Sequence, residues 1–128
     1  MRLKGKVAIV TGAGSGFGAG IAMRFAAEGA KVALLDINGD EVNALARRLS
    51  TNGGKAVAYQ TDVSEEPAVR GAISEIGAEF GRVDILVNNA GIYPRCRFED
   101  LTVSQWDRIQ AVNVRSTFLC SQAVLQFF

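Results

Sequence analysis

The sequence predicts an α/β fold in which helices cover both faces of a parallel sheet. Three observations predict it. Short apolar runs alternate with longer segments whose apolar residues recur at helical spacing. Turn signals bound each short run, which favours a buried parallel strand over a piece of helix. A glycine-rich turn, Thr11–Gly20 (TGAGSGFGAG), directly follows the first run. The predicted order is therefore β-α-β-α-β-α-β-α, with right-handed crossovers between parallel strands.

The first half of the chain predicts two strand–helix units. Val7–Val10 is the first strand and Lys31–Asp36 the second. The helix after the first strand ends at Gly29, and the helix after the second ends at Asn52-Gly53-Gly54, because glycine favours the end of a helix. The apolar faces of the two helices are Ile21, Ala22, Phe25 and Ala26 in the first, and Val42, Leu45, Ala46 and Leu49 in the second.

The second half predicts two further units. Lys55–Thr61 is the third strand and Val83–Val87 the fourth, and a helix that ends at Gly81 lies between them. Ser64 is the expected N-cap of that helix, with Glu65, Glu66 and Pro67 in its first turn. From about Val103 the pattern is helical to the end of the chain. The apolar positions are Val69, Ile73, Ile76 and Phe80 in the earlier helix, and Trp106, Ile109, Val112, Phe118, Leu119, Val124 and Leu125 in the later one.

Composition limits the function classes. The 128 residues suffice for one domain, and a net charge of +1 with scattered arginines argues against nucleic-acid and membrane partners. No apolar run is long enough to span a bilayer. The absence of histidine excludes Ser-His triads and ordinary zinc sites, so no metal is expected. With no signal peptide before the first strand and only two cysteines, Cys96 and Cys120, we expect a protein of the reducing cytoplasm.

The glycine-rich turn connects the first strand to the first helix, where a doubly wound sheet binds phosphate. Free N–H groups and the positive end of the helix dipole favour an anion there. The glycines fit two registers: G-x-G-x-x-A over Gly14, Gly16 and Ala19, or G-x-x-x-G-x-G over Gly12, Gly16 and Gly18. Spacing does not choose between them. The alternative interpretation is that the glycines only allow tight packing.

Asp36 strengthens the phosphate interpretation. It ends the second strand about 20 residues after the glycines, the place of the acidic residue that binds the ribose in dinucleotide-binding folds. A carboxylate there accepts both ribose hydroxyls and repels a 2′-phosphate. Ser15 and Ile37 bring no positive charge to offset that repulsion, so the sequence favours NAD over NADP. The alternative is that Asp36 only caps the next helix.

Further motifs make a family resemblance specific. "NNAG" (Asn88–Gly91), together with "TGAGSGFG", "LLDI", "TDVS" and "VNV", resembles the classical short-chain dehydrogenase/reductase family, and the similarity runs from Lys4 to the last residue. This resemblance implies a Rossmann-type doubly wound parallel sheet with strand order 3-2-1-4 in this chain. It also implies a nicotinamide cofactor and hydride transfer between an alcohol and a carbonyl. It selects the register of Gly12, Gly16 and Gly18.

The resemblance also implies residue roles. Asp62 is expected to meet the adenine amino group with Val63 beside the ring, and Asn88 to brace the sheet. Asn113 resembles the helix asparagine that holds a water in the family's proton relay. The positions expected to bind the cofactor are Gly12, Gly14, Ser15, Gly16, Phe17, Gly18, Asp36, Ile37, Asp62, Val63, Asn89, Ala90 and Gly91. Without the resemblance, turn and cap roles would be preferred for Asp62 and Asn89.

The sequence departs from the family at its catalytic groups. The family uses a serine after a fifth strand and a Tyr-x-x-x-Lys pair, in which the lysine lowers the pKa of the tyrosine. Neither Tyr59 nor Tyr93 has a lysine four residues later. We therefore expect residues 1–128 to be a single NAD-binding domain, truncated at its C-terminus, lacking the later strands and inactive alone. The complete enzyme would act on a small alcohol or ketone.

Two alternatives remain beside that oxidoreductase lineage. One is a stand-alone NAD-binding or interaction module without catalysis. The other, a flavin or S-adenosylmethionine site on the same fold, is disfavoured because it needs neither "NNAG" nor Asp62. Self-association is also expected. Val83–Val87 would form an exposed edge strand, and in the family the last helix commonly joins a subunit interface. The apolar residues expected on its surface are Phe118, Leu119, Leu125, Phe127 and Phe128.

Overall fold

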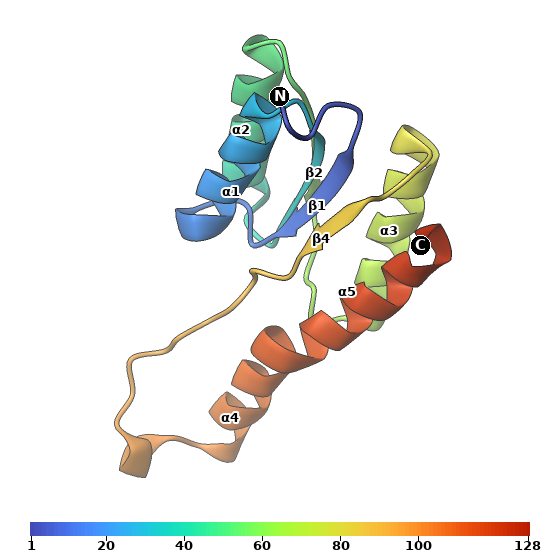
Figure 1. The fold of residues 1–128 in the computed structure, drawn as a ribbon. Helices are drawn as coiled ribbons and strands as arrows, with labels where there is room; N and C mark the ends of the chain where they lie inside the picture. The colour runs from blue at the N-terminus through green and yellow to red at the C-terminus, as the bar shows by residue number, and fades with distance from the viewer.

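Four parallel strands form one sheet in the order β3-β2-β1-β4 in the computed structural model, which describes all residues 1–128 (Figure 1). The strands are β1 (Val7–Thr11), β2 (Lys31–Asp36), β3 (Lys55–Gln60) and β4 (Ile85–Val87). Val7 of β1 pairs with Lys31 of β2, and Lys31 pairs with Lys55 of β3. Every residue of β1 is buried because this strand lies between β2 and β4 and is covered on both faces. The predicted strand order is confirmed.

Helices cover the two faces of the sheet, as the alternating pattern predicts. α1 (Gly16–Ala27) and α2 (Gly39–Thr51) pack on one face, and α3 (Glu66–Phe80) and α5 (Ser116–Val124) pack on the other (Figure 1). Successive side chains of a strand point to opposite faces. Ile9 of β1 therefore joins the core under α3 and α5, whereas Val10 joins the core under α1 and α2.

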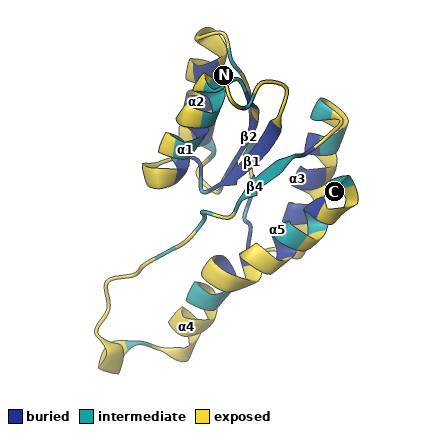
Figure 2. Cartoon of the chain, in the orientation of Figure 1, coloured by how far each residue is buried: buried dark blue, intermediate teal, exposed yellow.

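A long connection separates β4 from the helix that follows it. It runs extended to a short 3-10 turn, η1 (Phe98–Asp100), and then into α4 (Val103–Gln110). A capping box formed by Thr102 and Gln105 starts α4, which has no buried residue and extends away from the sheet (Figure 2). The chain continues through a π-helical stretch, η2 (Ala111–Arg115), into α5 and a final turn, η3 (Leu125–Phe127). The prediction of helix from Val103 onward is therefore correct, with a π-helical interruption in the middle.

The structure corrects some local predictions. Glu65, not Ser64, is the N-cap residue of α3, which begins at Glu66. The Ser64 hydroxyl accepts from Arg108 and donates to Asp62 at 2.6 Å instead of capping the helix. The fourth strand begins at Ile85 rather than Val83, whose side chain turns into the core. The other strand ends shift by one residue, at Thr11 and Gln60.

The last helix exposes fewer apolar side chains than predicted. Leu119 is buried in the core between α3, α5 and the sheet, and Phe127 is partly buried against the same core. Phe118, Leu125 and Phe128 are exposed. The prediction of Leu119 as a surface residue is therefore wrong, because α5 turns that side chain toward the sheet. No helix combines the length and the apolar character that crossing a membrane requires.

Candidate functional site

A cleft of about 290 Å³ lies where the strands end. Segments that follow all four strands line it, and α4 and η2 add one residue each. Ligands of open α/β sheets bind at this edge, where the strand order reverses. The predicted site residues in its wall are Gly12, Ser15, Asp36, Ile37, Asp62, Val63, Asn89, Ala90 and Gly91, and other wall residues include Arg108 and Val112.

The glycine turn is built from two kinds of glycine. A Cβ on Gly18 would lie 2.1 Å from the Gly12 carbonyl oxygen, and a Cβ on Gly12 would lie 2.9 Å from the Ala90 Cα, so both positions need glycine for packing. Gly16 differs: a Cβ there would meet nothing within 4 Å, although its φ of 56° favours glycine. The packing interpretation thus explains Gly12 and Gly18, whereas Gly16 borders open space.

The start of α1 fits an anion. Ser15, its N-cap, makes no side-chain cap hydrogen bond, and the first turn carries no acidic residue. The first N–H groups of α1 therefore have no side-chain acceptor, while the helix dipole is positive at this end. Phe17, in the same turn, is 88% exposed. A diphosphate can approach this backbone closely because Gly16 leaves the space in front of it open.

Asp36 is held by two backbone groups. Its Oδ2 accepts a hydrogen bond from the Gly14 N–H at 2.8 Å, and its Oδ1 accepts one from the Asn38 N–H at 2.9 Å. Since each carboxylate oxygen can accept more than one hydrogen bond, both oxygens keep capacity for a diol. The N-cap of α2 is Asn38, whose side chain accepts from the Glu41 N–H, so Asp36 is not itself the cap. Its hydrogen bond with the Asn38 N–H still gives Asp36 a local role at the start of α2.

A second carboxylate stands beside Asp36. A Cβ on Gly14 would lie 2.8 Å from Asp36 Oδ2 and 3.1 Å from Glu41 Oε2. Glu41 is thus close to the same corner of the cleft, and no sequence motif marks it. No lysine or arginine forms a salt bridge with either carboxylate. This corner of the cleft is therefore acidic.

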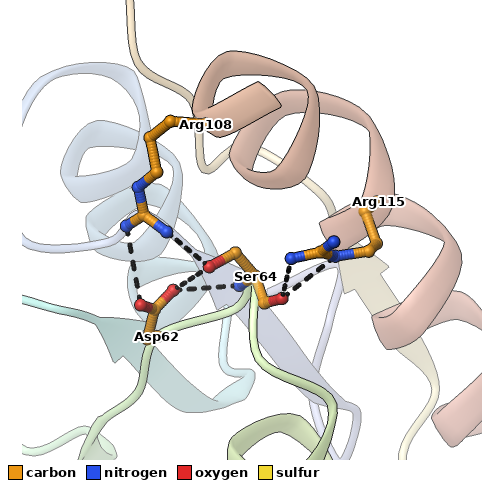
Figure 3. Close-up of polar contacts among 4 residues, drawn as sticks. All are labelled: Asp62, Ser64, Arg108 and Arg115. Atoms are coloured by element: carbon orange, nitrogen blue, oxygen red, sulfur yellow. Dashed lines mark hydrogen bonds and ion pairs between the residues drawn. The ribbon is translucent and has the colours of Figure 1, made fainter. Parts of the chain in front are cut away.

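Asp62 belongs to a cluster that joins the loop after β3 to α4 and η2, which carry Arg108 and Arg115 (Figure 3). Its Oδ1 accepts hydrogen bonds from the Ser64 N–H at 3.0 Å and the Ser64 hydroxyl at 2.6 Å, and Arg108 lies 3.5 Å from its Oδ2. Arg115 donates two hydrogen bonds to the Ser64 carbonyl, at 3.2 and 2.9 Å. Burial raises the pKa of Asp62, but the Ser64 hydrogen bonds and the Arg108 charge outweigh burial, so the net pKa is lowered.

The segment after β4 is tied to the glycine turn. Asn89 donates through Nδ2 to the carbonyl oxygens of Thr11 and Gly12, at 3.1 and 3.2 Å. The Thr11 hydroxyl oxygen accepts from the N–H groups of Asn89 and Ala90, each at 3.0 Å. Asn89 therefore braces the glycine turn. Asn88 donates to Ser121 on α5 at 3.2 Å and so links the sheet to that helix.

Asn113 lies in η2, and its side chain makes two hydrogen bonds with the backbone of Ile92. Its Oδ1 accepts from the Ile92 N–H at 2.7 Å, and its Nδ2 donates to the Ile92 carbonyl at 2.9 Å. This pair of hydrogen bonds fixes the chain just beyond Gly91 against the helix. Asn113 thus has a positioning role in the structure, and its water-holding role stays a prediction.

Besides Glu41, sequence reasoning missed Thr11, Arg108 and Arg115. Thr11 was counted only as the first residue of the glycine-rich turn, and the arginines only as scattered charges. The one available signal is the spacing of seven between the arginines, which places both on one side of a helix. No group of three or more histidine, cysteine, aspartate or glutamate side chains could hold a metal ion.

Known proteins are similar to this chain over nearly its whole length. A family model described as short chain dehydrogenase matches residues 6–128. D-threitol dehydrogenase of Mycolicibacterium smegmatis is 45% identical over 123 residues, which cover 96% of this chain and 47% of that relative. The chain thus spans about half the length of the curated relatives it matches.

Solved structures agree with the match. A short chain dehydrogenase from Burkholderia cenocepacia, in complex with NADP, has a TM-score of 0.95 and 40% identity, covering 100% of this chain and 53% of its own. A 3-ketoacyl-(acyl-carrier-protein) reductase from Brucella melitensis, complexed with NADH, has a TM-score of 0.91 and 42% identity, covering 98% and 51%. The two structures carry different nicotinamide cofactors.

Proposed function

The chain belongs to the short-chain dehydrogenase family, and from that premise we propose that it is the cofactor-binding part of an NAD-dependent oxidoreductase. Proteins of this family bind a nicotinamide cofactor, which supplies the hydride acceptor or donor when bound. The proposed substrate is a small alcohol or ketone, as the names of dehydrogenase relatives such as D-threitol dehydrogenase suggest. We propose this activity for the whole enzyme because the curated relatives, which the chain matches over about half their length, are named dehydrogenases.

The residues of the cleft fit such a cofactor. The open space at Gly16 and the free N–H groups of α1 suit the diphosphate. Asp36 suits the adenosine ribose, with Ile37 beside it, and Asp62 and Val63 suit the adenine. Asn89, Ala90 and Gly91 would form the wall along the cofactor's ribose. Phe17, also proposed to contact the cofactor, lies outside this lining, in the first turn of α1.

The observation that carries the choice of NAD is the acidic corner around Asp36. Asp36 and Glu41 lie beside Gly14, with no arginine or lysine paired to them. A 2′-phosphate in this corner would face two carboxylates, and like charges in a partly buried cleft repel strongly. A ribose with free hydroxyls instead offers donors to both carboxylate oxygens. The corner therefore supports NAD over NADP.

The acid–base chemistry of the reaction is not supplied by residues 1–128. No tyrosine in this range has a lysine four residues later, and the Asn113 amide does not titrate near neutral pH. We expect this chain to bind the cofactor and, alone, to give no turnover at an enzymatic rate. The competing function is a stand-alone NAD-binding module, which the same residues would also support.

We also propose a cytoplasmic location and a homo-oligomeric assembly. Cys96 is exposed and Cys120 is buried, and neither is in a disulfide, which suits a reducing cytoplasm. β4 is an edge strand of the sheet, and Phe118 and Leu125 are exposed, which supports a homo-oligomer.

The test is to titrate the 128-residue chain, its mass confirmed, with NAD and NADH by calorimetry, and then to follow NADH absorbance with a panel of secondary alcohols and ketones. We expect binding without turnover. Failure to bind any nicotinamide dinucleotide would overturn the proposed function. Robust turnover would overturn the expected inactivity and would make Tyr93 the first residue to replace.

A further inference from the structure

Arg108 contacts the proposed adenine end of the cleft from a distant part of the chain. It lies on α4, 44 residues after Ser64, and lines the same cleft as Asp62. Its Nη1 donates a 2.7 Å hydrogen bond to the Ser64 hydroxyl, and its Nη2 lies 3.5 Å from Asp62 Oδ2 (Figure 3). The Arg108 side chain is 46% exposed, whereas Ser64 is only 1% exposed. The guanidinium therefore covers a buried hydroxyl and flanks the carboxylate.

The hydrogen bonds of this cluster can run in only one direction. A guanidinium has donors and no acceptor, and an ionised carboxylate has acceptors and no donor. Arg108 must therefore donate to the Ser64 oxygen, and the single Ser64 hydroxyl proton must point to Asp62 Oδ1, 2.6 Å away. The Ser64 N–H donates to the same oxygen at 3.0 Å. Asp62 Oδ1 is thus held by two donors, one of which Arg108 orients.

Asp62 Oδ2 remains available to a ligand. Its separation of 3.5 Å from Arg108 is an ion-pair distance, longer than an ordinary N–H to oxygen hydrogen bond. No other donor reaches Oδ2. Because Oδ1 is fixed on the Ser64 side and Arg108 flanks Oδ2, the plane of the carboxylate is set. The cleft therefore presents one oriented, negatively charged acceptor.

We propose that Arg108 is a positioning residue for base selectivity, which orients Asp62 through Ser64 so that the cleft favours a purine with an exocyclic amino group over one with a carbonyl at that place. This proposal rests on the proposed function, because it assumes that the base of the dinucleotide lies at Asp62. An amino group donates to Oδ2. A carbonyl there would place its oxygen, an acceptor, against the acceptor Oδ2 and leave Oδ2 without a donor. A polar site rejects a near-identical ligand when that ligand leaves one of its polar groups unpaired.

Arg115 provides a natural contrast within the same cluster. Its two hydrogen bonds reach only the backbone carbonyl of Ser64, and it does not touch Asp62. Arg115 therefore holds the loop after β3, while Arg108 acts on the carboxylate. Loss of Arg115 is expected to weaken all ligands of the cleft alike, whereas loss of Arg108 is expected to change which base is preferred.

The experiment compares NAD with nicotinamide hypoxanthine dinucleotide, in which the adenine amino group is replaced by a carbonyl. Both are titrated calorimetrically into the chain and its variants, with thermal unfolding as a check on folding. We expect the unsubstituted chain to prefer NAD by about tenfold or more, the value of a hydrogen bond to a charged group. Arg108→Met is expected to reduce that preference to about threefold or less. Arg108→Lys should give an intermediate value, since lysine cannot contact Ser64 and Asp62 together in the fork geometry.

The controls separate positioning from general damage. Arg115→Met should weaken both dinucleotides by the same factor. Arg70→Met, at an exposed position on α3 paired only with Glu66, should change neither. In the double variant Arg108→Met/Asp62→Ala, base preference should be no lower than in Asp62→Ala alone, because Arg108 acts through Asp62.

The outcomes distinguish this proposal from the one on which it rests. If the unsubstituted chain binds neither dinucleotide, the proposed function fails and this inference fails with it. If the chain binds NAD but Arg108→Met keeps the full preference, or weakens both dinucleotides equally, the inference alone is overturned. Independent effects of Arg108 and Asp62 in the double variant would also overturn it, since Arg108 would then act on the base directly.

Discussion

The N–H of Gly14 donates a 2.8 Å hydrogen bond to Oδ2 of Asp36, which joins the glycine turn after β1 to the end of β2. Two segments that are 22 residues apart thus share one corner of the cleft. The position of the carboxylate is set by the same backbone that leaves the diphosphate space open at Gly16. One hydrogen bond therefore joins the proposed phosphate site to the proposed ribose site.

Asp36 is expected to determine the choice of cofactor. The unsubstituted chain should prefer NAD over NADP by about 100-fold or more, because a 2′-phosphate would face Asp36 and Glu41. Asp36→Ala should reduce this preference by about tenfold without abolishing binding, since Glu41 remains. Calorimetric titration with both cofactors measures it.

Asp40→Ala is the matched control for Asp36→Ala. It removes the same charge at an exposed position in the first turn of α2. The Asp40→Ala variant should prefer NAD over NADP by nearly the same factor as the unsubstituted chain. Tighter binding of NADP than of NAD by the unsubstituted chain would contradict the prediction.

Gly16 is expected to be needed for both conformation and approach. Alanine at a φ of 56° costs about 1–2 kcal/mol, so Gly16→Ala should lower the free energy of unfolding by that amount. Its methyl group would also enter the space proposed for the diphosphate, so NAD affinity should fall, and further in Gly16→Val. Thermal unfolding and calorimetry measure the two effects. A folded Gly16→Val variant that binds NAD unchanged would mean that the phosphate site is elsewhere.

Gly20 on α1 provides the control for Gly16. A Cβ there also meets nothing within 4 Å, but the position has no positive φ. Gly20→Ala should raise the free energy of unfolding by up to about 1 kcal/mol, the difference in helix propensity, and leave NAD affinity unchanged.

Asp84 is expected to make stability depend on acid pH. It exchanges hydrogen bonds with Val7: the Val7 N–H donates to Asp84 Oδ2 at 2.9 Å, and the Asp84 N–H donates to the Val7 carbonyl at 2.8 Å. The hydrogen bonds from Arg82, followed by the bond from Val7, lower the pKa of Asp84. A lowered carboxyl pKa adds stability that is present above the unfolded-state pKa of about 4 and is lost as the pH falls through the folded-state value.

Asp84→Asn should therefore reduce the free energy of unfolding at pH 7 by about 1 kcal/mol, and the difference from the unsubstituted chain should narrow below about pH 4. Denaturant unfolding at a series of pH values measures it. Asp107→Asn removes the same charge at an exposed position on α4 and is the control; its free energy of unfolding at pH 7 should stay within about 0.5 kcal/mol of that of the unsubstituted chain. A difference that stays constant with pH would count against the role of the carboxylate.

The two thiols are expected to differ in reactivity. Cys96 is exposed, whereas Cys120 is buried in the core between α3, α5 and the sheet. Burial raises the pKa of Cys120 to about 11, so little of it is thiolate near pH 8. A chromogenic disulfide reagent at pH 8 should modify one thiol in the folded chain and both after unfolding. Cys96→Ser should then show no fast reaction; rapid modification of two thiols in the native chain would contradict the burial of Cys120.

Self-association is expected from the exposed apolar surface. Phe118 and Leu125 on the last helical segment are 59% and 65% exposed, and β4 leaves one edge of the sheet unpaired. Light scattering should show a dimer or a larger species, and Phe118→Asp should shift the chain toward monomer. A monomer at high concentration without any substitution would contradict this expectation.

The sequence alone determined the architecture because local patterns encode it. Periodicity distinguished strands from helices, glycine and Asn-Gly-Gly stops separated them, and Asp36 was placed at the carboxyl end of β2 by its position after an apolar run. The parallel order followed from strand–helix alternation and the family resemblance. The strand, helix and stop signals each lie within a few residues of the feature they predict, whereas the strand order needed the pattern of the whole chain.

The tertiary structure decided which distant residues meet. Ser64 looked like a helix cap, but it binds Asp62 and receives Arg108 and Arg115, which follow it by 44 and 51 residues. Leu119 looked exposed, but the packing of α5 against the sheet buries it. Such contacts depend on how α4, η2 and α5 dock across the strand ends. No local pattern encodes that docking, because it results from the packing of side chains contributed by several separate elements.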